Sequence, residues 1–305
     1  MTQKVAFVTD PLNLSTPAAA TTLALMRTAQ ELGLEVYWME ASDLHIQNNR
    51  PVASLSSFRF LGNNPNEYVM GPSFVAQLDD LDQVWWRKHA PYNNADFVAL
   101  DILQMVDDST LLYNEPGTIR GLNEALFALQ FNEWTPESLV TRNPLAIRAF
   151  LAEHGPEALA RPLDGDSSHV FLLREGDINL TSLLQELTKD GSQAMLVQKH
   201  ITAESIKRLF LFNGELLEAV EQTSDEAHPL PTMEQGAQAS VTQLNSQELE
   251  LVAAIGPVLR ERGVYLATVD VVADLIVGMN VTCPAGFEVL ATEESNLLTQ
   301  VFQAD

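Results

Sequence analysis

The sequence predicts a mixed α/β protein, with an open N-terminal α/β domain followed by two smaller α+β blocks. Its 305 residues are 46% apolar, which is typical of a globular chain that is large enough for several subdomains. A strand, a helix and a second strand follow one another at the start, in the order of an open sheet with a crossover helix. From residue 139 onward the elements are shorter and more closely spaced, which indicates the smaller blocks.

The first predicted domain, residues 1–122, alternates strands and helices. Its opening strand is the apolar run at 5–9. A helix at 18–32 ends at Gly33, because glycine readily takes the left-handed conformation that follows a helix. Further strands are predicted at 34–39, 83–86 and 110–113, a hairpin at 44–60, and helices at 95–106 and 119–131.

Two further domains are predicted at 123–192 and 193–305. The second is expected to hold strands at 139–141, 159–161 and 170–173 and helices at 144–153 and 179–187. The third is expected to hold strands at 195–198, 208–212, 216–220, 264–272 and 275–282, a helix at 246–262 and a C-terminal helix ending at Phe302. Ser246 is predicted to cap the long helix, because its hydroxyl can accept a hydrogen bond from a free N–H group of the first turn.

The chain is strongly acidic. It has 41 Asp and Glu residues against 17 Lys and Arg, for a formal charge of −24. That balance excludes a nucleic-acid-binding protein, which needs a basic surface. It is compatible with a solvated acidic surface, or with a field that selects a cationic partner and repels anions. The lysines are only Lys4, Lys88, Lys189, Lys199 and Lys207.

We expect a cytoplasmic protein with no membrane partner. A single cysteine, Cys283, cannot form an internal disulfide and favours a reducing compartment. We interpret it as a small buried apolar residue. No signal-peptide pattern precedes the first strand, and no apolar run is long enough to span a bilayer. The six histidines include no pair four residues apart, so no metal site made of protein ligands alone is expected.

Several stretches carry a resemblance to a known family. The strongest reads Thr-Pro-Glu-Ser-Leu-Val-Thr-Arg-Asn at 135–143. The others are Asp10-Pro11, the run at 37–44, Arg87-Lys88 followed by Pro91, Arg120, Asn123-Glu124 with Leu126-Phe127, the run at 161–165, Lys207-Arg208 with Asn213-Gly214, and the run at 280–284. In their order and spacing they are similar to the prokaryotic glutathione synthetase family. The resemblance implies an N-terminal substrate domain at 1–122 and two ATP-grasp subdomains, a small one at 123–192 and a C-terminal one at 193–305.

The resemblance also implies an ATP- and Mg²⁺-dependent ligase that phosphorylates a dipeptide carboxylate, which glycine then attacks. The nucleotide-binding positions it implies are Arg161, Gln198 and Lys199. Two phosphate-binding lysines of the family are replaced here, by Glu115 and by Arg161, and the glycine-rich loop reads Asp-Ser-Ser-His at 166–169. Phosphoryl transfer depends on neutralising phosphate charge, so these changes argue against ATP binding.

The implied metal ligands are Asp270 and Asn280, but Gly278 stands where the family has a bridging glutamate. Arg161 and Arg208 are what remains of the implied catalytic set. No Lys or Arg occurs between Arg208 and Arg260, where the family supplies arginines. The acidic residues of that segment are Glu215, Glu218, Glu221, Asp225, Glu226, Glu234, Glu248 and Glu250. We therefore expect no cofactor.

A substrate-like pocket is implied at Asp10, Arg87, Arg120 and Asn123. These residues either keep a pocket for a small acid or serve the fold alone, and both interpretations stay open. Two other clusters are given structural interpretations. Trp85 and Trp86 alternate along a strand and are expected in the core, and the three aspartates at 79–82 are expected in a solvated loop.

Three functional hypotheses follow. The first is a pseudoenzyme that has lost Mg-ATP binding and acts as a binding, scaffold or regulatory protein, as a homo-oligomer or together with another protein. The second is an active ATP-dependent carboxylate–amine ligase, in which Arg161 and Lys199 cover for the missing lysines. The third is a sensor of a small acidic or thiol-peptide ligand that uses the region between Arg87 and Asn123.

Overall fold

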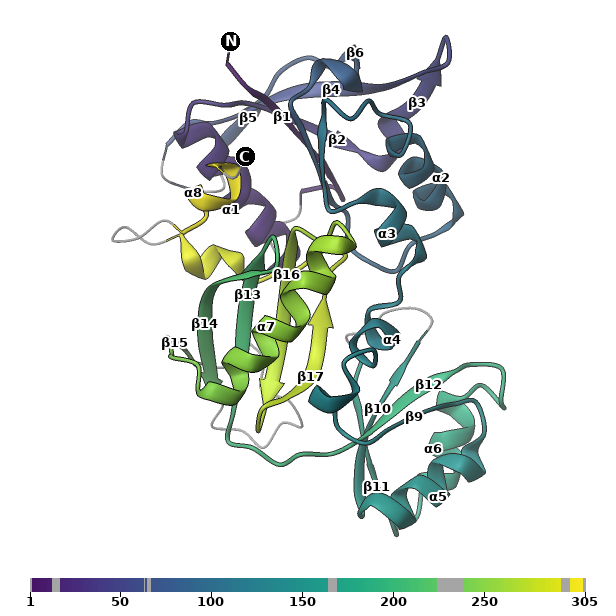
Figure 1. The fold of residues 1–305 in the computed structure, drawn as a ribbon. Coiled ribbons are helices and arrows are strands. Elements are labelled where there is room, and N and C mark those ends of the chain that lie inside the picture. The colour runs from purple at the N-terminus through teal and green to yellow at the C-terminus, as the bar shows by residue number, and fades with distance from the viewer. Residues whose placement is uncertain are drawn as a thin grey trace.

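The computed structural model describes residues 2–12, 17–62, 64, 67–163, 169–223, 238–291 and 297–303. They form three sheets, and the predicted mixed α/β class is confirmed. The N-terminal sheet lies at the top of Figure 1, the five-stranded sheet below it, and the four-stranded sheet at the lower right. None of the described helices is both long and apolar enough to cross a membrane.

The N-terminal sheet is built around parallel strands. Its order is β3-β4-β2-β1-β7-β8, and β5 and β6 also pair with β4. The bounds are β1 Lys4–Thr9, β2 Glu35–Glu40, β3 Leu44–Gln47, β4 Arg50–Phe60, β5 Tyr68–Met70, β6 Phe74–Gln77, β7 Gln83–Arg87 and β8 Leu111–Tyr113. Strand β1 is a continuous apolar run because it lies between β2 and β7 and is buried on both faces. The predicted hairpin is β3–β4, joined at Asn48 and Asn49, whose positive φ angles suit a two-residue turn.

Helices α1 (Pro17–Glu31) and α2 (Asn94–Leu103) contribute to separate hydrophobic clusters of this domain. Trp85 lies in the cluster of α1 and Trp86 in the cluster of α2, so the core interpretation of both is confirmed. The single helix predicted at 119–131 is wrong. It is two short helices, α3 (Pro116–Gly121) and α4 (Glu124–Ala128), because the Asn123 side chain accepts a hydrogen bond from the Leu126 N–H and starts a new helix.

The small subdomain is an antiparallel sheet in the order β11-β10-β12-β9. Its elements are β9 Ser138–Thr141, α5 Pro144–His154, β10 Glu157–Pro162, β11 Phe171–Arg174, α6 Leu180–Leu187 and β12 Met195–Lys199. The two helices and the sheet share one core, which includes Ile147, Leu173 and Leu184. Strand β12 was predicted to open the third domain, but it pairs with β10 and β9. By sheet membership the division therefore falls after β12.

The C-terminal subdomain is a sheet in the order β15-β14-β13-β16-β17, with a long helix on one face (Figure 1). Its elements are β13 Ser205–Phe212, β14 Glu215–Thr223, β15 Gln238–Val241, α7 Ser246–Glu261, β16 Leu266–Val272, β17 Leu275–Asn280 and α8 Thr299–Gln303. The N-cap of α7 is Asn245 rather than Ser246, because the Asn245 side chain accepts from the Gln247 and Glu248 N–H groups. Gly256 of α7 approaches Gly214 so closely that a Cβ on either would lie 2.2 Å from the other's carbonyl oxygen.

The end of the chain returns to the N-terminal domain. The short helix at Phe287–Leu290 and the helix α8 both contact α1. Phe302 of α8 lies 5.2 Å from Trp85, ring centroid to centroid, and Phe287 joins the same cluster. The N-terminal domain and the C-terminal subdomain therefore share one hydrophobic core, whereas the small subdomain has a core of its own.

Candidate functional site

A small cavity lies between the four-stranded and five-stranded sheets. Arg161 and Gln198 line it from β10 and β12, Val277 and Gly278 from β17, and Glu124 from α4. Its volume is about 20 Å³, which is room for about one water molecule. The described residues therefore bring Arg161 and Gln198 of the implied nucleotide site together, in a space that side chains nearly fill.

Arg161 reaches across this cavity from one sheet to the other. Its Nη2 donates a hydrogen bond of 2.7 Å to the Val277 carbonyl oxygen. Val277 is the extra residue of a β-bulge, since Asp270 pairs with Gly278 and Val271 pairs with Ile276. Burial lowers the pKa of Arg161, and the nearby Asp270 carboxylate opposes that effect. The arginine thus gives the carbonyl of the bulged residue a hydrogen-bond donor from the other sheet.

The other implied nucleotide residues are engaged locally. Gln198 is buried, and its Nε2 donates to the Ser138 hydroxyl at 3.1 Å. The Lys199 ammonium lies 3.5 Å from the Glu137 carboxylate, and Lys199 is absent from the cavity lining. Adjacent residues of a strand point to opposite faces, which explains why Gln198 faces the cavity and Lys199 does not.

At the implied metal position, Arg208 binds Asp270. The Arg208 Nε lies 2.7 Å from one Asp270 oxygen and its Nη2 lies 2.9 Å from the other. Both side chains are largely buried. Gly278 is paired with Asp270 on the next strand, and a Cβ there would lie 3.2 Å from the Asp270 Oδ2. The Asn280 Oδ1 accepts from the Cys283 N–H at 3.1 Å.

These residues do not fit Mg²⁺ as they stand. Mg²⁺ prefers several oxygen ligands in near-octahedral geometry, and it usually takes one or two carboxylates plus phosphate. Here both oxygens of Asp270 accept hydrogen bonds from Arg208, and the paired position, Gly278, has no side chain. In the part of the chain that the structure describes, no group of three or more His, Cys, Asp or Glu side chains is arranged to hold a metal.

Two of the acidic residues that argue against ATP binding, Glu115 and Glu221, lie away from this cavity. Glu115 is the N-cap of α3, and its N–H donates to the Gly263 carbonyl, just after α7, at 2.9 Å. Glu221 lies on β14 and accepts a hydrogen bond of 2.6 Å from the Ser205 hydroxyl. Neither side chain is in the cavity lining. Asp166, Asp225, Glu226 and Glu234 lie outside the described residues.

The implied substrate pocket is only partly assembled. Asp10 and Arg87 end neighbouring parallel strands, and Asp10 accepts from the Lys88 Nζ at 2.5 Å and from the His89 N–H at 2.8 Å. Arg87 is buried, and it donates to the Thr22 hydroxyl at 3.1 Å and to the Pro284 carbonyl at 2.8 Å. Carboxyl ends of parallel strands meet at one edge of a sheet, so this part follows from the topology.

Arg120 and Asn123 have other partners. Arg120 on α3 pairs with Asp101 of α2, and its guanidinium lies over the Phe97 ring. Asn123 donates from Nδ2 to the Leu163 carbonyl at 2.8 Å, which ties α4 to the small subdomain. In this structure the side chains of Arg120 and Asn123 therefore contact other parts of the protein rather than Asp10 or Arg87.

Sequence reasoning missed two polar residues that join the subdomains. The Asn114 side chain donates to the Leu266 and Val281 carbonyls and accepts from the Tyr265 and Leu266 N–H groups, all at 2.7–2.8 Å. The Glu124 Oε1 accepts from the Val281 N–H, the Thr282 N–H and the Thr282 hydroxyl, each at 2.8 Å. Burial raises the pKa of Glu124. The sequence signal for each was its place in a family-like stretch, Glu124 next to Asn123 and Asn114 in the turn where Glu115 replaces a family lysine.

Two family models match this chain. "Prokaryotic glutathione synthetase, N-terminal domain" matches residues 3–120, and "Prokaryotic glutathione synthetase, ATP-grasp domain" matches residues 124–295. The glutathione synthetase of Synechococcus elongatus is 32% identical over 298 residues, which cover 93% of this chain and 91% of that protein. The glutathione synthetase of Mesorhizobium japonicum is 29% identical over 289 residues, which cover 94% and 92%.

Solved structures show the same architecture. A RiPP-associated ATP-grasp ligase of Chryseobacterium gregarium, in complex with ADP and a leader and core peptide, has a TM-score of 0.69 at 14% identity, over 99% of this chain and 98% of that one. A D-cycloserine synthetase has a TM-score of 0.68 at 14% identity, over 98% of both chains. At this identity the likeness shows the fold alone. Fold and family models agree: the chain belongs to the prokaryotic glutathione synthetase family of ATP-grasp proteins.

Proposed function

We propose that this chain is a binding protein of the glutathione synthetase family that does not use Mg-ATP. The observation that carries the proposal is the bidentate pair between Arg208 and Asp270 beside Gly278. A charge that is already satisfied by a protein cation must be released before it can bind a metal ion, and the partly buried position makes that release costly. The Asp270 carboxylate at the implied metal position is therefore neutralised by the Arg208 guanidinium.

The cavity beside this pair supports the same proposal. Its lining holds one cationic side chain, Arg161, and one carboxylate, Glu124. A triphosphate carries about four negative charges, and catalysis of its transfer depends on their neutralisation. Arg161 already bonds the opposite sheet, so little positive charge is left for a phosphate.

An active ATP-dependent carboxylate–amine ligase is the second candidate. The comparisons favour it, because the curated relatives are named glutathione synthetase and align over nearly the whole chain. In a ligase, Arg161 would leave Val277 and Arg208 would leave Asp270 when nucleotide enters. The two proposed functions are compatible with the same fold. They differ in whether Arg161 and Arg208 leave their protein partners to bind nucleotide.

Thermal melting with and without Mg-ATP separates the two candidates. A ligand that binds only the folded state raises its stability, by about 2.7 kcal/mol at one hundred times the Kd. We expect no change in Tm for this chain, and a clear rise for the Synechococcus elongatus glutathione synthetase measured in parallel. A nucleotide-dependent rise in this chain would contradict the proposal and support the ligase.

A second melting series tests what the protein binds instead. At the ends of β1 and β7 the Lys88 ammonium contacts Asp10 and the buried Arg87 contacts Thr22 and Pro284, and the family resemblance implies a small acid at this position. Glutathione and γ-glutamylcysteine are the probes. A rise in Tm with either peptide in the absence of nucleotide supports a role in thiol-peptide sensing, whereas no response assigns these residues to the fold alone.

A further inference from the structure

A second cavity lies in the N-terminal domain, at the opposite end of the molecule from the small subdomain (Figure 1). Its volume is about 320 Å³, which is within the range of small-molecule sites. None of its lining residues takes part in the site between the sheets, nor in the family resemblance apart from Tyr37. The cavity is therefore separate from the implied nucleotide site, and it can bind a ligand whether or not that site binds ATP.

The pairing of β4 explains why this space is open. Strand β2 pairs with β4 at Ser56 and Ser57, and β6 pairs with residues 52–55 on the same side of β4. Two strands therefore follow one another along one edge of β4, and the cavity forms where β2 gives way to β6. The turn after β6 and the start of β1 close its other sides.

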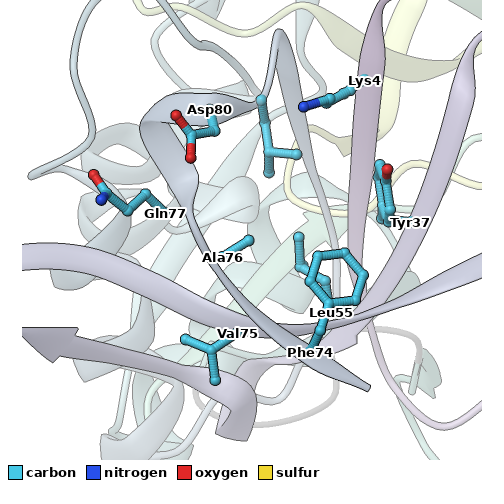
Figure 2. A pocket seen from close by; sticks show the side chains of 9 residues that line it. Lys4, Tyr37, Leu55, Phe74, Val75, Ala76, Gln77 and Asp80 are labelled. Carbon is cyan, nitrogen blue, oxygen red and sulfur yellow. The ribbon is translucent and has the colours of Figure 1, made fainter. Parts of the chain in front are cut away.

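The apolar wall of the cavity is aromatic. The rings of Tyr37 and Phe74 meet edge to face, with centroids 5.9 Å apart and planes at 75°. Leu55 behind them is 1% exposed, whereas Phe74 remains 46% exposed. Figure 2 shows these three side chains gathered on one side of the cavity. A ligand that covers Phe74 would remove apolar surface from water at that point.

The cavity also carries two opposite charges. Figure 2 shows Lys4 on the same side as Tyr37 and Asp80 across the cavity from it. Among the residues that the structure describes, neither side chain has an ion-pair partner. Asp82 fixes the main chain of Lys4, because the Lys4 N–H donates to the Asp82 Oδ2 at 2.7 Å and the Asp82 N–H donates to the Lys4 carbonyl at 3.0 Å.

The turn that carries Asp80 is also fixed. It is a single helical turn at Leu78–Asp80, closed by a hydrogen bond from the Leu81 N–H to the Leu78 carbonyl. The Thr110 hydroxyl donates to the Leu81 carbonyl at 2.8 Å. Both charged groups are therefore carried by a main chain that is already ordered, which lowers the entropy cost of binding.

We propose that this cavity binds a free hydrophobic α-amino acid. Its carboxylate pairs with Lys4, its ammonium with Asp80, and its side chain covers Phe74 and Tyr37. A zwitterion suits this site better than an anion does, because the chain's charge of −24 repels a ligand that is negative overall. The volume suits one such molecule.

Calorimetric titration of the full chain with L-phenylalanine tests the proposal. We expect saturable binding of one molecule per chain. Phenethylamine lacks the carboxylate and 3-phenylpropionate lacks the ammonium, so each should bind at least about tenfold more weakly, as the loss of one charged contact requires. Equal binding of either analogue, or the absence of heat with phenylalanine, would overturn the proposal.

Single substitutions assign the contacts. Lys4→Gln and Asp80→Asn should each weaken phenylalanine binding about tenfold. The matched controls are Lys189→Gln and Asp190→Asn, an exposed lysine and aspartate in the small subdomain that should leave the Kd unchanged. A Kd that rises as much in the controls as in the cavity variants, or that is unchanged in both cavity variants, would contradict the assignment. Melting curves of each variant without ligand confirm that it folds.

Discussion

Arg208 and Asp270 are directly paired on adjacent strands, and two hydrogen bonds of 2.7 and 2.9 Å join their side chains. The pair lies where the family resemblance implies a metal ligand, and Gly278 opposes Asp270 on the next strand. A glycine there leaves Asp270 without a second carboxylate beside it. With Gly278 where the resemblance implies a bridging glutamate, both Asp270 oxygens accept from Arg208.

Asp270→Asn should destabilise the fold. The substitution removes the charge and sets an amide donor against one of the guanidinium donors, in a pair that is largely buried. We expect the free energy of unfolding to fall by about 2 kcal/mol in urea titrations. Glu137→Gln is the control, because its pair with Lys199 is exposed and should contribute less than about 0.5 kcal/mol. Equal stability of the two variants would assign Asp270 no structural role.

Arg161→Met tests whether the arginine keeps the two sheets together. Methionine retains an apolar stem but leaves the bulged Val277 carbonyl without its donor, which should cost about 1–2 kcal/mol in the free energy of unfolding. Arg174→Met on the same small sheet is the control, since Arg174 is mostly exposed and pairs with Glu157. Mg-ATP should stabilise neither variant. Nucleotide binding that appears in wild type and disappears in Arg161→Met would instead make Arg161 a nucleotide ligand.

Local patterns predicted the parts of the fold that local forces decide. The strand β1, the helix after it and the β3–β4 hairpin follow from apolar periodicity and turn residues. Strands β5 and β6 were missed because they are short and exist by pairing with the long β4. The break at Asn123 was missed because the apolar pattern continues through this residue. The pattern does not show that the Asn123 side chain caps a new helix.

The candidate site was predictable to the extent that topology places residues. Asp10 and Arg87 lie at one edge of the sheet because Arg87 ends β7 and Asp10 directly follows β1, which pairs with β7 in parallel. The contact between Arg161 and Val277 was not predictable, because it joins two sheets and depends on a bulge in β17. Arg120 was expected in a pocket, but in the structure its guanidinium pairs with the carboxylate of Asp101 on α2.

The Cys283 thiol should be inert in the folded protein. It is buried, its Sγ lies 3.4 Å from the Arg87 carbonyl, and burial raises its pKa, so little thiolate forms at neutral pH. We expect a chromogenic disulfide reagent to react slowly with native protein and at once in denaturant. Fast stoichiometric reaction in native buffer would contradict the structural interpretation of this residue.

Glu124→Gln should stabilise the protein at neutral pH. All three hydrogen bonds to Glu124 go to one oxygen, Oε1, which a glutamine retains. The carboxylate meanwhile has a raised pKa, chiefly because burial disfavours its charged form. The folded state therefore holds the proton at pH values at which the unfolded chain has already released it.

The sign of the pH dependence follows from that difference. As pH rises through the window between the usual value of 4.5 and the raised pKa, the folded state binds more protons than the unfolded state, so wild-type stability falls. Glutamine has no proton to lose, so the stability of Glu124→Gln relative to wild type should be small at pH 4, should grow through the window and should remain above it. Urea titrations at several pH values measure this difference, with the exposed Glu250→Gln as the control for removing a charge from an acidic chain. A Glu124→Gln variant that is less stable than wild type at pH 7 would show that the ionised carboxylate strengthens its three hydrogen bonds by more than its burial costs.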